Sequence, residues 1–389
     1  MAKSSFVPNP AMIKVIGLGG GGCNAITRMV REQIQGVEFV AMNTDSQALA
    51  VTEAPTRIQL GEKLTRGLGS GGDNTLGQKS AEESRDELKQ VVAGADMVFV
   101  TAGMGGGTGT GAAPVVAEIA KQSGALTIAI VTKPFAFEGT RRSKVADEGI
   151  NQLLTKVDTL IIIPNDRLLN LCDQQTNVDN AFRMADDVLK HGVQAIAEVI
   201  TVPGIINLDF ADVKAIMKNA GPAWMSIGNG TGKNRAVDAA KEALASPLLD
   251  VTLSGSKGVL FNVVGNSSLT LFEVNEAADV IREAVDPEAN IIFGVAHDPN
   301  MDRDVKITLI ATGFLSKTGM LGTDDEEINQ FLKGIKNEDE LDMPSFLRRP
   351  LFNHRRQTIT PTNKEIKATT SSSAPPPTPL HYNSRESDN

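Results

Sequence analysis

The fold is decided by residues 103–112, which read Gly103-Met104-Gly105-Gly106-Gly107-Thr108-Gly109-Thr110-Gly111-Ala112. This stretch follows Asp96–Thr101, which is typical of a buried strand, and precedes Ala113–Lys121, which is typical of a helix. In a turn without side chains, backbone N–H groups converge on an anion, and the positive end of the helix dipole adds to them. A tight turn needs only one or two glycines. We therefore predict a phosphate cradle, in which the hydroxyls of Thr108 and Thr110 are available to a phosphate oxygen or a metal-bound water.

A second glycine-rich turn, Gly19–Gly22, stands between a predicted strand over Met12–Leu18 and a predicted helix. Together with Gly17 it satisfies the G-x-G-x-x-G fingerprint, so a Rossmann-type NAD-dependent enzyme is an alternative. That alternative does not explain the cradle at residues 105–111. A third glycine-rich stretch, Gly67–Gly77, is predicted to be a mobile loop that closes over a phosphate.

Predicted strands alternate with predicted helices along the first half of the chain. Apolar runs predict further strands over residues 37–42, 126–131 and 159–164, and a helix over residues 80–92. This alternation is typical of a doubly wound α/β fold, in which ligands bind at the carboxyl ends of parallel strands. Asn43-Thr44-Asp45 and Asn165-Asp166 stand at two of these ends.

The second half begins with the longest predicted helix, Val178–Ile200. Phe182 and Asp186 lie one turn apart on it and can face the same site, although core packing is the alternative for Phe182. Asp209 and Asp212 stand at a predicted helix start, where capping and the helix dipole explain acidic residues without any catalytic role. From Trp224 onward, the pattern predicts a smaller α+β domain. The glycine-rich stretch 228–234 lacks the spacing of a P-loop, and we assign it no phosphate.

Composition excludes several classes of protein. The 389 residues carry a formal net charge of -9, which argues against a nucleic-acid partner. The two cysteines, Cys23 and Cys172, cannot form a disulfide framework, and no side-chain cluster has the spacing of a metal site. The chain has no run of apolar residues as long as a transmembrane span and no apolar signal core, so a cytoplasmic location is expected. Because there is no P-loop lysine, backbone amides, a divalent cation and Arg142 must offset the charge of the phosphates.

Four motifs in order resemble the tubulin/FtsZ family of GTPases, and within it the bacterial cell-division branch, FtsZ. They are Lys14–Gly22, Gly105–Gly111, Phe135–Arg142 and Asn207–Asp212. The resemblance covers about residues 12–314. It implies a GTPase domain with a Rossmann-like parallel sheet, joined by a long central helix to a smaller α+β domain, then a disordered tail. Tubulin itself is disfavoured, because this chain is shorter and carries a docking peptide of the bacterial kind.

The resemblance implies these parts of the chain. They are a flexible amino terminus (1–10), a GTP-binding domain (11–176), the central helix (177–200), a catalytic loop and following helix (201–222), a carboxy-terminal α+β domain (223–316), an acidic linker (317–341), a docking peptide with a basic segment (342–356) and a disordered tail (357–389).

It also implies a site for GTP or GDP, with Mg²⁺ held through the phosphates and water. The residues expected to hold the phosphates and the magnesium side are Gly19, Gly20, Gly21, Gly22, Asn43, Thr44, Gly71, Gly72, Gly105, Gly106, Gly107, Thr108 and Gly109. Glu138 and Arg142 are expected to contact the ribose and phosphates. Asn24, Asn165, Phe182 and Asp186 are expected to recognise guanine, Phe182 by stacking and Asp186 by accepting from the base.

In the resembling family, Asp209, Asp212 and Asn207 act in trans. The loop that carries them enters the nucleotide site of the next subunit, so GTP hydrolysis is coupled to head-to-tail assembly of a homopolymer in the cell-division ring at mid-cell. Phe346, Leu347, Arg348 and Arg349 are expected to bind membrane-anchor and division-regulator proteins. A relative that assembles as a scaffold without hydrolysis is the remaining alternative.

Three departures from the family pattern affect these expectations. Cys23 is expected near the nucleotide and sensitive to thiol reagents. Asp73-Asn74-Thr75 is expected to place an extra negative charge beside the phosphates and so to weaken affinity or alter magnesium dependence. The docking peptide is followed by a further tail and preceded by a short acidic linker, which shortens its reach.

Overall fold

The computed structural model describes residues 11–169, 177–201, 209–246, 248, 253, 255–298, 301 and 303–314. Asn207, Cys172, the first ten residues and everything after Phe314 lie outside these ranges. The expectations for the acidic linker, the docking peptide and the tail therefore concern residues that are not described.

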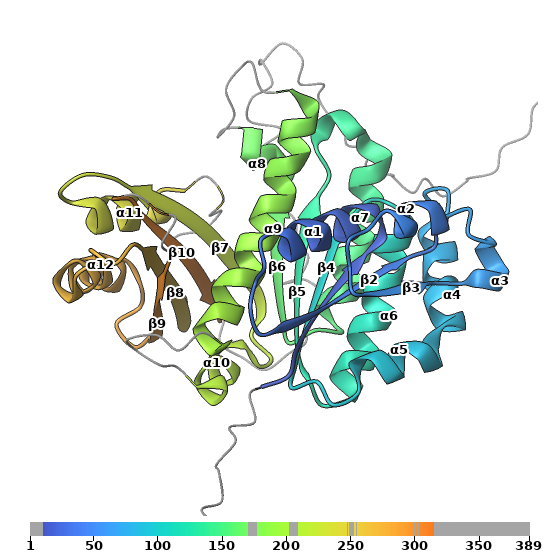
Figure 1. The fold of residues 1–389 in the computed structure, drawn as a ribbon, viewed down its shortest axis with the longest axis horizontal. Helices are drawn as coiled ribbons and strands as arrows, with labels where there is room; N and C mark the ends of the chain where they lie inside the picture. The colour runs from blue at the N-terminus through green and yellow to red at the C-terminus, as the bar shows by residue number, and fades with distance from the viewer. Residues whose placement is uncertain are drawn as a thin grey trace, which may run out of the picture. The chain divides into compact units, whose positions relative to one another are not determined.

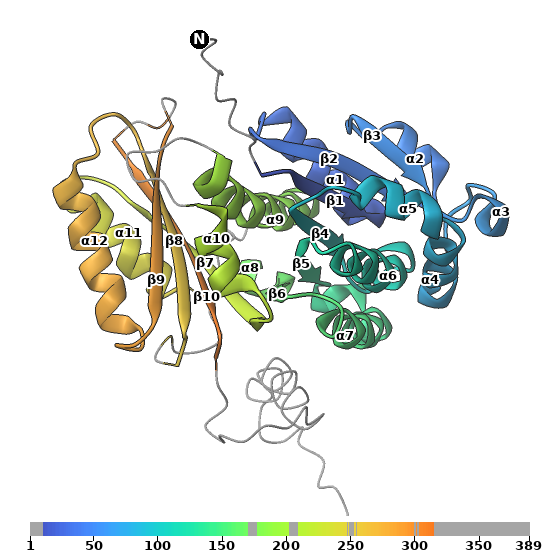
Figure 2. The same ribbon diagram turned by 90° about the horizontal axis from the view of Figure 1, so that it is seen from below.

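A single ten-stranded sheet runs through the described part of the chain, in the order β3-β2-β1-β4-β5-β6-β7-β10-β8-β9 (Figures 1 and 2). Its strands are β1 (Ile13–Leu18), β2 (Val37–Asn43), β3 (Thr56–Gln59), β4 (Met97–Gly103), β5 (Leu126–Lys133), β6 (Thr159–Pro164), β7 (Gly221–Gly230), β8 (Gly258–Gly265), β9 (Asn290–His297) and β10 (Val305–Thr312). The strands from β3 to β6 are all parallel. Strand order reverses between β1 and β4, which is the switch point where doubly wound sheets bind ligands. The predicted doubly wound fold is confirmed.

Helices cover both faces of this parallel part. They are α1 (Gly19–Arg31), α2 (Ser46–Ala50), α3 (Glu62–Thr65), α4 (Asn74–Glu83), α5 (Arg85–Val92), α6 (Thr108–Gln122), the 3₁₀ turn η1 (Ala136–Glu138), α7 (Thr140–Leu154), α8 (Asn165–Leu169), α9 (Val178–Thr201) and α10 (Phe210–Met217). One core lies between the sheet and α1, α9 and α10, and a second lies between the sheet and α5, α6 and α7. The sheet is therefore buried on both faces, as its continuous apolar strands require.

The region that follows the third glycine-rich stretch departs from the prediction. A single helix was expected over residues 80–92, but α4 begins at Asn74 and a break at Ser84 separates it from α5. The early start has a local cause, because the Asp73 carboxylate accepts hydrogen bonds from the backbone N–H groups of Thr75 and Leu76. The glycine-rich loop therefore ends at Asp73 instead of Gly77.

The helix α9 links the two halves of the sheet. Its buried face includes Ala185, Leu189, Val193 and Ile196, which follow the three- and four-residue steps of the predicted apolar stripe. Figure 1 shows α8 at one end of α9 and α10 at the other. The helix thus separates Phe182 and Asp186, which lie near its start, from Asp209, which follows its end.

The carboxy-terminal half forms a third core with α11 (Arg235–Leu244) and α12 (Leu271–Ala284). Its first strand, β7, was not predicted. Strand β7 pairs with β6 over Thr159–Ile161, so the strands of the carboxy-terminal half continue the parallel sheet of the first half. No helix in the described part of the chain combines the length and apolar character needed to span a bilayer.

The rejected glycine-rich stretch owes its glycines to packing. A Cβ atom on Gly228 would lie 2.1 Å from the carbonyl oxygen of Ala239, and one on Gly230 would lie 1.8 Å from that of Arg235. Both glycines belong to β7, and both oxygens belong to α11. Glycine at these positions lets the helix approach the strand closely, which is a structural reason that requires no phosphate.

Candidate nucleotide-binding site

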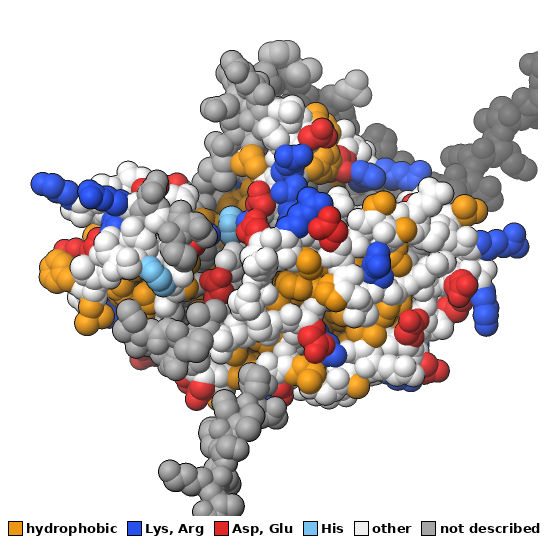
Figure 3. All heavy atoms as spheres, in the orientation of Figure 1, with side chains coloured by type: hydrophobic (Ala, Val, Ile, Leu, Met, Phe, Trp, Pro, Cys, Tyr) orange, Lys and Arg blue, Asp and Glu red, His pale blue; other side chains and the backbone are white. Residues whose placement is uncertain are grey.

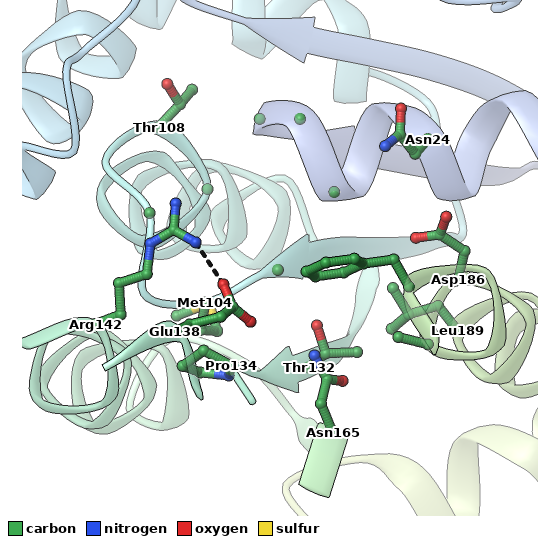
Figure 4. Close-up of a pocket in the computed structure, with 18 of the residues that line it drawn as sticks. Asn24, Met104, Thr108, Thr132, Pro134, Glu138, Arg142, Asn165, Asp186 and Leu189 are labelled. Atoms are coloured by element: carbon green, nitrogen blue, oxygen red, sulfur yellow. Dashed lines mark hydrogen bonds and ion pairs between the residues drawn. The ribbon is translucent and has the colours of Figure 1, made fainter. Parts of the chain in front are cut away.

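A cavity of about 400 Å³ opens at the carboxyl ends of the parallel strands (Figure 4). Thirteen of the predicted ligand residues line it: Gly19, Gly20, Gly21, Asn24, Gly106, Gly107, Thr108, Gly109, Glu138, Arg142, Asn165, Phe182 and Asp186. The cavity lies where the strand order reverses, between the turns that follow β1 and β4. Both glycine-rich turns therefore face one space. The glycine pattern of each turn indicated an anion site there, but it did not show that the two turns share a single cavity.

Predicted residues that do not line the cavity have other places. Gly22 packs α1 against the sheet, since a Cβ atom there would lie 2.5 Å from the carbonyl oxygen of Thr101. Gly105 has φ +98°, a conformation that favours glycine, and a Cβ atom there would lie 2.8 Å from the Arg142 carbonyl oxygen. Thr44 and Asn43 are buried at the end of β2. Gly71 and Gly72 lie exposed in the loop before Asp73.

The phosphate end is built by two helix starts. The helices α1 and α6 begin at Gly19 and Thr108, both on the cavity. The turns nearly touch, because a Cβ atom on Gly19 would lie 2.9 Å from the backbone nitrogen of Gly109. Two helix amino termini with free N–H groups make a site that favours an anion. The Thr110 hydroxyl, expected to face a phosphate, instead accepts from the Gly105 N–H at 2.8 Å and closes the turn.

Sequence reasoning missed several lining residues: Ser70, Gly103, Met104, Thr132, Pro134, Ala185 and Leu189. Most are apolar or small residues of the strand ends and of α9, and their type carries no functional signal. Ser70 is different, because its hydroxyl lies 3.1 Å from that of Thr108. A lone serine in a glycine-rich loop has no periodicity that would have revealed it.

An aromatic group and several polar groups form the other end of the cavity. Phe182 is 40% exposed, so it is not the core residue that its helical position allowed. The buried ring of Phe135 meets it edge-on, with centroids 5.4 Å apart. Asn165 is buried, and within the described contacts its Oδ1 atom accepts no hydrogen bond. An exposed ring beside an unpaired amide oxygen is suited to a heterocyclic base.

Asp186 is held by an arginine of α1. Arg28 Nε lies 3.1 Å from Asp186 Oδ2, and its Nη1 atom lies 3.5 Å from Asp187 Oδ1. Burial raises the pKa of Asp186 to about 6, although the Arg28 charge opposes that rise. Figure 3 shows Lys and Arg side chains gathered beside acidic ones on the face that carries α1 and α9. A carboxyl group held in this way is oriented before any ligand arrives.

Glu138 and Arg142 form an ion pair at the edge of the cavity, which Figure 4 marks with a dashed line. The other Glu138 oxygen accepts from the backbone N–H of Phe135 at 2.9 Å. This bond fixes the carboxylate on η1, and the carboxylate in turn holds the exposed guanidinium of Arg142. The pair carries no net charge, but it fixes the N–H donors of Arg142 on the side where the phosphates are expected.

Asp209 and Asp212 lie away from the cavity, beyond the far end of α9. Asp209 caps α10, and its Oδ1 atom accepts from the Asp212 N–H at 2.8 Å. Asp212 lies exposed in the first turn of α10. A helix rises about 1.5 Å per residue, so the span of α9 from Phe182 to Thr201 is roughly 28 Å. These carboxylates therefore do not belong to the cavity of their own chain.

Two departures from the family pattern have different consequences from those expected. Cys23 is 2% exposed and does not line the cavity, and burial raises its thiol pKa to about 11. For the folded protein, this burial predicts little sensitivity to thiol reagents, contrary to the expectation from the sequence. Asp73 does not line the cavity either, and its carboxylate is engaged as the cap of α4. Its hydrogen bonds lower the pKa of Asp73, so it stays charged, but the charge is directed at a helix start.

The donor set fits a magnesium ion that is carried by a nucleotide. No group of three or more His, Cys, Asp or Glu side chains suited to a metal exists among the described residues. The nearby acids Asp45 and Asp73 are both used as helix caps. What remains at the phosphate end is hydroxyl oxygens, and Mg²⁺ is typically bound through substrate phosphates, water and few protein oxygens.

Comparisons with known proteins agree with this geometry. A sequence model of the GTPase domain of the tubulin/FtsZ family matches residues 12–173, and one of the C-terminal domain of the FtsZ family matches residues 221–315. An empty FtsZ dimer from M. jannaschii is 45% identical, with a TM-score of 0.77, over 82% of this chain and 96% of that chain. A mutant FtsZ from M. jannaschii is 47% identical, with a TM-score of 0.77, over 78% of this chain and 92% of that one.

A more distant structure shows likeness of fold alone. CetZ2 from Haloferax volcanii, solved as a GTPγS-bound protofilament, is 18% identical, with a TM-score of 0.67, over 85% of this chain and 100% of that chain. The family matches overturn the NAD-dependent alternative. Two of its fingerprint glycines, Gly17 and Gly22, serve packing, since a Cβ atom on Gly17 would lie 2.4 Å from the carbonyl oxygen of Gly22.

Proposed function

The chain belongs to the tubulin/FtsZ family and is a GTPase of that family, and we propose that it assembles head-to-tail into filaments of the cell-division ring. Each GTP is hydrolysed at the contact between two subunits. The nucleotide lies in the cavity of one subunit, and Asp209, Asp212 and Asn207 come from the next.

One observation supports this proposal: among the described residues, the cavity is lined by groups suited to a base and to phosphates, but by no free acid at its phosphate end. Glu138 is bonded to Arg142 and Phe135, and Asp186 lies at the base end. The paired aspartates Asp209 and Asp212 lie beyond the other end of α9. A contact that brings one subunit's cavity to the next subunit's aspartates joins different surfaces, so its repetition produces an open filament.

The cavity residues divide the binding of GTP among them. Phe182 stacks on guanine, while Asp186, Asn24 and Asn165 form hydrogen bonds to the edge of the base. Glu138 addresses the ribose, and Arg142 together with the N–H groups of Gly19–Gly21 and Gly106–Gly109 offsets the phosphate charge. Magnesium, bound through the phosphates, supplies further positive charge to the transition state. An aspartate from the neighbouring subunit orients the attacking water, because an ionised carboxylate accepts a hydrogen bond from it.

The first test measures GTP turnover per subunit against protein concentration, with Mg²⁺ and with light scattering recorded in parallel. We expect turnover to appear only above a threshold concentration, at which scattering also rises. Turnover per subunit that stays constant at every dilution would mean that each chain holds a complete active site, and the filament proposal would be wrong.

The second test separates the charge of the aspartates from their structural role. Asp209→Ala removes both the carboxylate and the cap of α10, whereas asparagine is itself a good cap. We expect Asp209→Asn and Asp212→Asn to bind GTP normally and to lose turnover. Asp238→Asn, in the first turn of α11, is the matched control and keeps turnover. Loss of GTP binding in either variant of the α10 aspartates would contradict the assignment.

The match to the family's GTPase domain argues against the alternative of a scaffold without hydrolysis, and the same turnover measurement tests it. The pair of aspartates at the start of α10 favours the enzyme.

For the cellular role, residues 342–356 are proposed to tether filaments to membrane-anchor and regulator proteins at mid-cell. Deleting them is expected to leave turnover unchanged and to abolish the mid-cell ring in cells. A ring that persists in the deleted variant would refute the tether.

A further inference from the structure

Three hydroxyl groups from distant parts of the chain meet at the phosphate end of the cavity. Thr44 Oγ1 lies 2.6 Å from Thr108 Oγ1, and Ser70 Oγ lies 3.1 Å from the same atom. All three residues are buried, and Ser70 and Thr108 also line the cavity. Thr108 is therefore the centre of a small hydroxyl cluster at the edge of the ligand space.

The loop that carries Ser70 is built to present this one side chain. Gly69, Gly71 and Gly72 have φ values of +82°, +58° and +82°, a region that favours glycine. The Gly69 N–H donates to the Thr44 carbonyl oxygen at 3.2 Å, which ties the loop to the end of β2. A Cβ atom on Gly107 would lie 2.2 Å from Ser70 Oγ, so glycine at 107 leaves the room that the hydroxyl occupies.

The direction of the hydroxyl protons decides what Thr108 offers a ligand. A threonine hydroxyl has one proton to donate and can accept two hydrogen bonds. When Thr44 and Ser70 both donate to Thr108, the proton of Thr108 is free to point into the cavity toward an anion. Successive hydrogen bonds of this kind polarise one another in a poorly solvated site, so the two neighbours strengthen Thr108 as a donor.

We propose that Ser70 is a positioning residue of the nucleotide site, which directs the Thr108 hydroxyl to the terminal phosphate of a nucleoside triphosphate and so favours triphosphate over diphosphate. The inference rests on the proposed function and adds to it that Thr108, which begins α6 at the phosphate end of the cavity, faces the third phosphate of GTP. With a diphosphate that place holds no phosphate, so the proton of Thr108 turns back to its neighbours and Ser70 adds little to affinity.

The test compares the Kd values of GTP and GDP in the wild type and in Ser70→Ala, at protein concentrations below assembly. We expect the Kd of GTP to rise about five-fold, the effect of one neutral hydrogen bond, while that of GDP changes less than about two-fold. Both Kd values are measured on one preparation of each variant, so a reduced fraction of active protein does not change the ratio of the GTP Kd to the GDP Kd. Ser46→Ala is the matched control, because it removes another hydroxyl bond to the same loop, at Gly67, and should leave the ratio unchanged.

A double-mutant cycle shows whether Ser70 acts through Thr108. In a Thr108→Val background, Ser70→Ala should have no further effect on GTP affinity. An equal loss for both nucleotides in Ser70→Ala, or the same loss in the Thr108→Val background, would overturn the inference. If Ser70→Ala leaves both affinities unchanged while the wild type binds GTP, only this inference fails. If the wild type binds neither nucleotide, the proposed function itself fails.

Discussion

Asp186 illustrates how a single residue links burial to ligand choice. Burial raises its pKa to about 6 from an ordinary 3.8, and Arg28 at 3.1 Å opposes the rise. Between these two pH values the folded protein holds a proton that the unfolded chain has released, so this group lowers stability as pH rises through the window. A group that costs stability in this way, inside a cavity, is typical of a functional site.

The same pKa predicts how GTP binding depends on pH. Guanine offers two N–H groups, and a carboxyl accepts both only when it is ionised. We expect GTP affinity to be level above about pH 7 and to fall by up to tenfold per pH unit below about pH 6. Calorimetric titration across this range checks the profile. Asp186→Asn serves as the control, with weak binding that varies little with pH, and a flat wild-type profile down to about pH 5 would contradict the role of Asp186.

Cys23 leads to a second prediction at this scale. A thiol that is 2% exposed and has a pKa of about 11 is almost entirely protonated at neutral pH, and the thiolate is the reactive form. We expect a maleimide reagent to leave Cys23 unmodified in the folded protein and to modify it once denaturant is added. Peptide mass mapping of residue 23 measures this, and rapid labelling of the native protein would show that the pocket around the thiol opens.

Residue roles were predictable where the chain pattern places side chains together. The four-residue step from Phe182 to Asp186 predicted a shared site, and both line the cavity. The place of Cys23 was not predictable, because a position after a glycine-rich turn does not say whether a side chain points to the ligand or to the core. Ser70 was also out of reach, since its role depends on a hydroxyl contact to Thr108, 38 positions later.

Secondary-structure elements were predictable where periodicity was strong. The helix α9 and the strands from β4 to β6 follow their apolar patterns closely. By contrast, β7 was missed, because Gly221–Gly230 contains three glycines and a proline and shows no alternation of apolar and polar residues. Tertiary packing against α11 makes it a strand. The split between α4 and α5 depends on the local conformation at Ser84, which residue type alone does not specify.

The packing of β7 against α11 supplies a prediction at the element scale. In Gly230→Ala, the new methyl group would lie 1.8 Å from the Arg235 carbonyl oxygen and 2.7 Å from the Ala239 nitrogen. Both are backbone atoms of a helix and cannot move independently. We expect a loss of at least about 1–3 kcal/mol in the free energy of unfolding. Urea denaturation measures it, with Gly255→Ala as the control, because no atom lies within 4 Å of a Cβ atom there. Equal stability of the two variants would refute the packing argument.

On the scale of the whole described molecule, the sheet and α9 together set the distance between the cavity and the aspartates at the start of α10. The sequence patterns predicted two halves and a long helix between them. They did not predict that β6 and β7 pair, which makes one sheet pass through both halves. With 24 residues, α9 is long enough to hold Phe182 at the cavity and Asp209 beyond the opposite end. In the proposed function, this separation would make hydrolysis a property of two subunits.

A mixing experiment tests that property directly. Asp212→Asn keeps the cavity and loses the carboxylate proposed to be catalytic, whereas Asp186→Ala loses the contact proposed for guanine and keeps the aspartates of α10. Each variant alone should be inactive. In an equal mixture, a junction works when an intact cavity meets an intact α10, so up to about a quarter of junctions should be active if the contact is head-to-tail. Recovered turnover, measured by phosphate release while co-sedimentation confirms mixed filaments, would therefore place the two halves of the active site on different chains. Mixed filaments without any recovery would place them on the same chain, and the reach of α9 would then need another explanation.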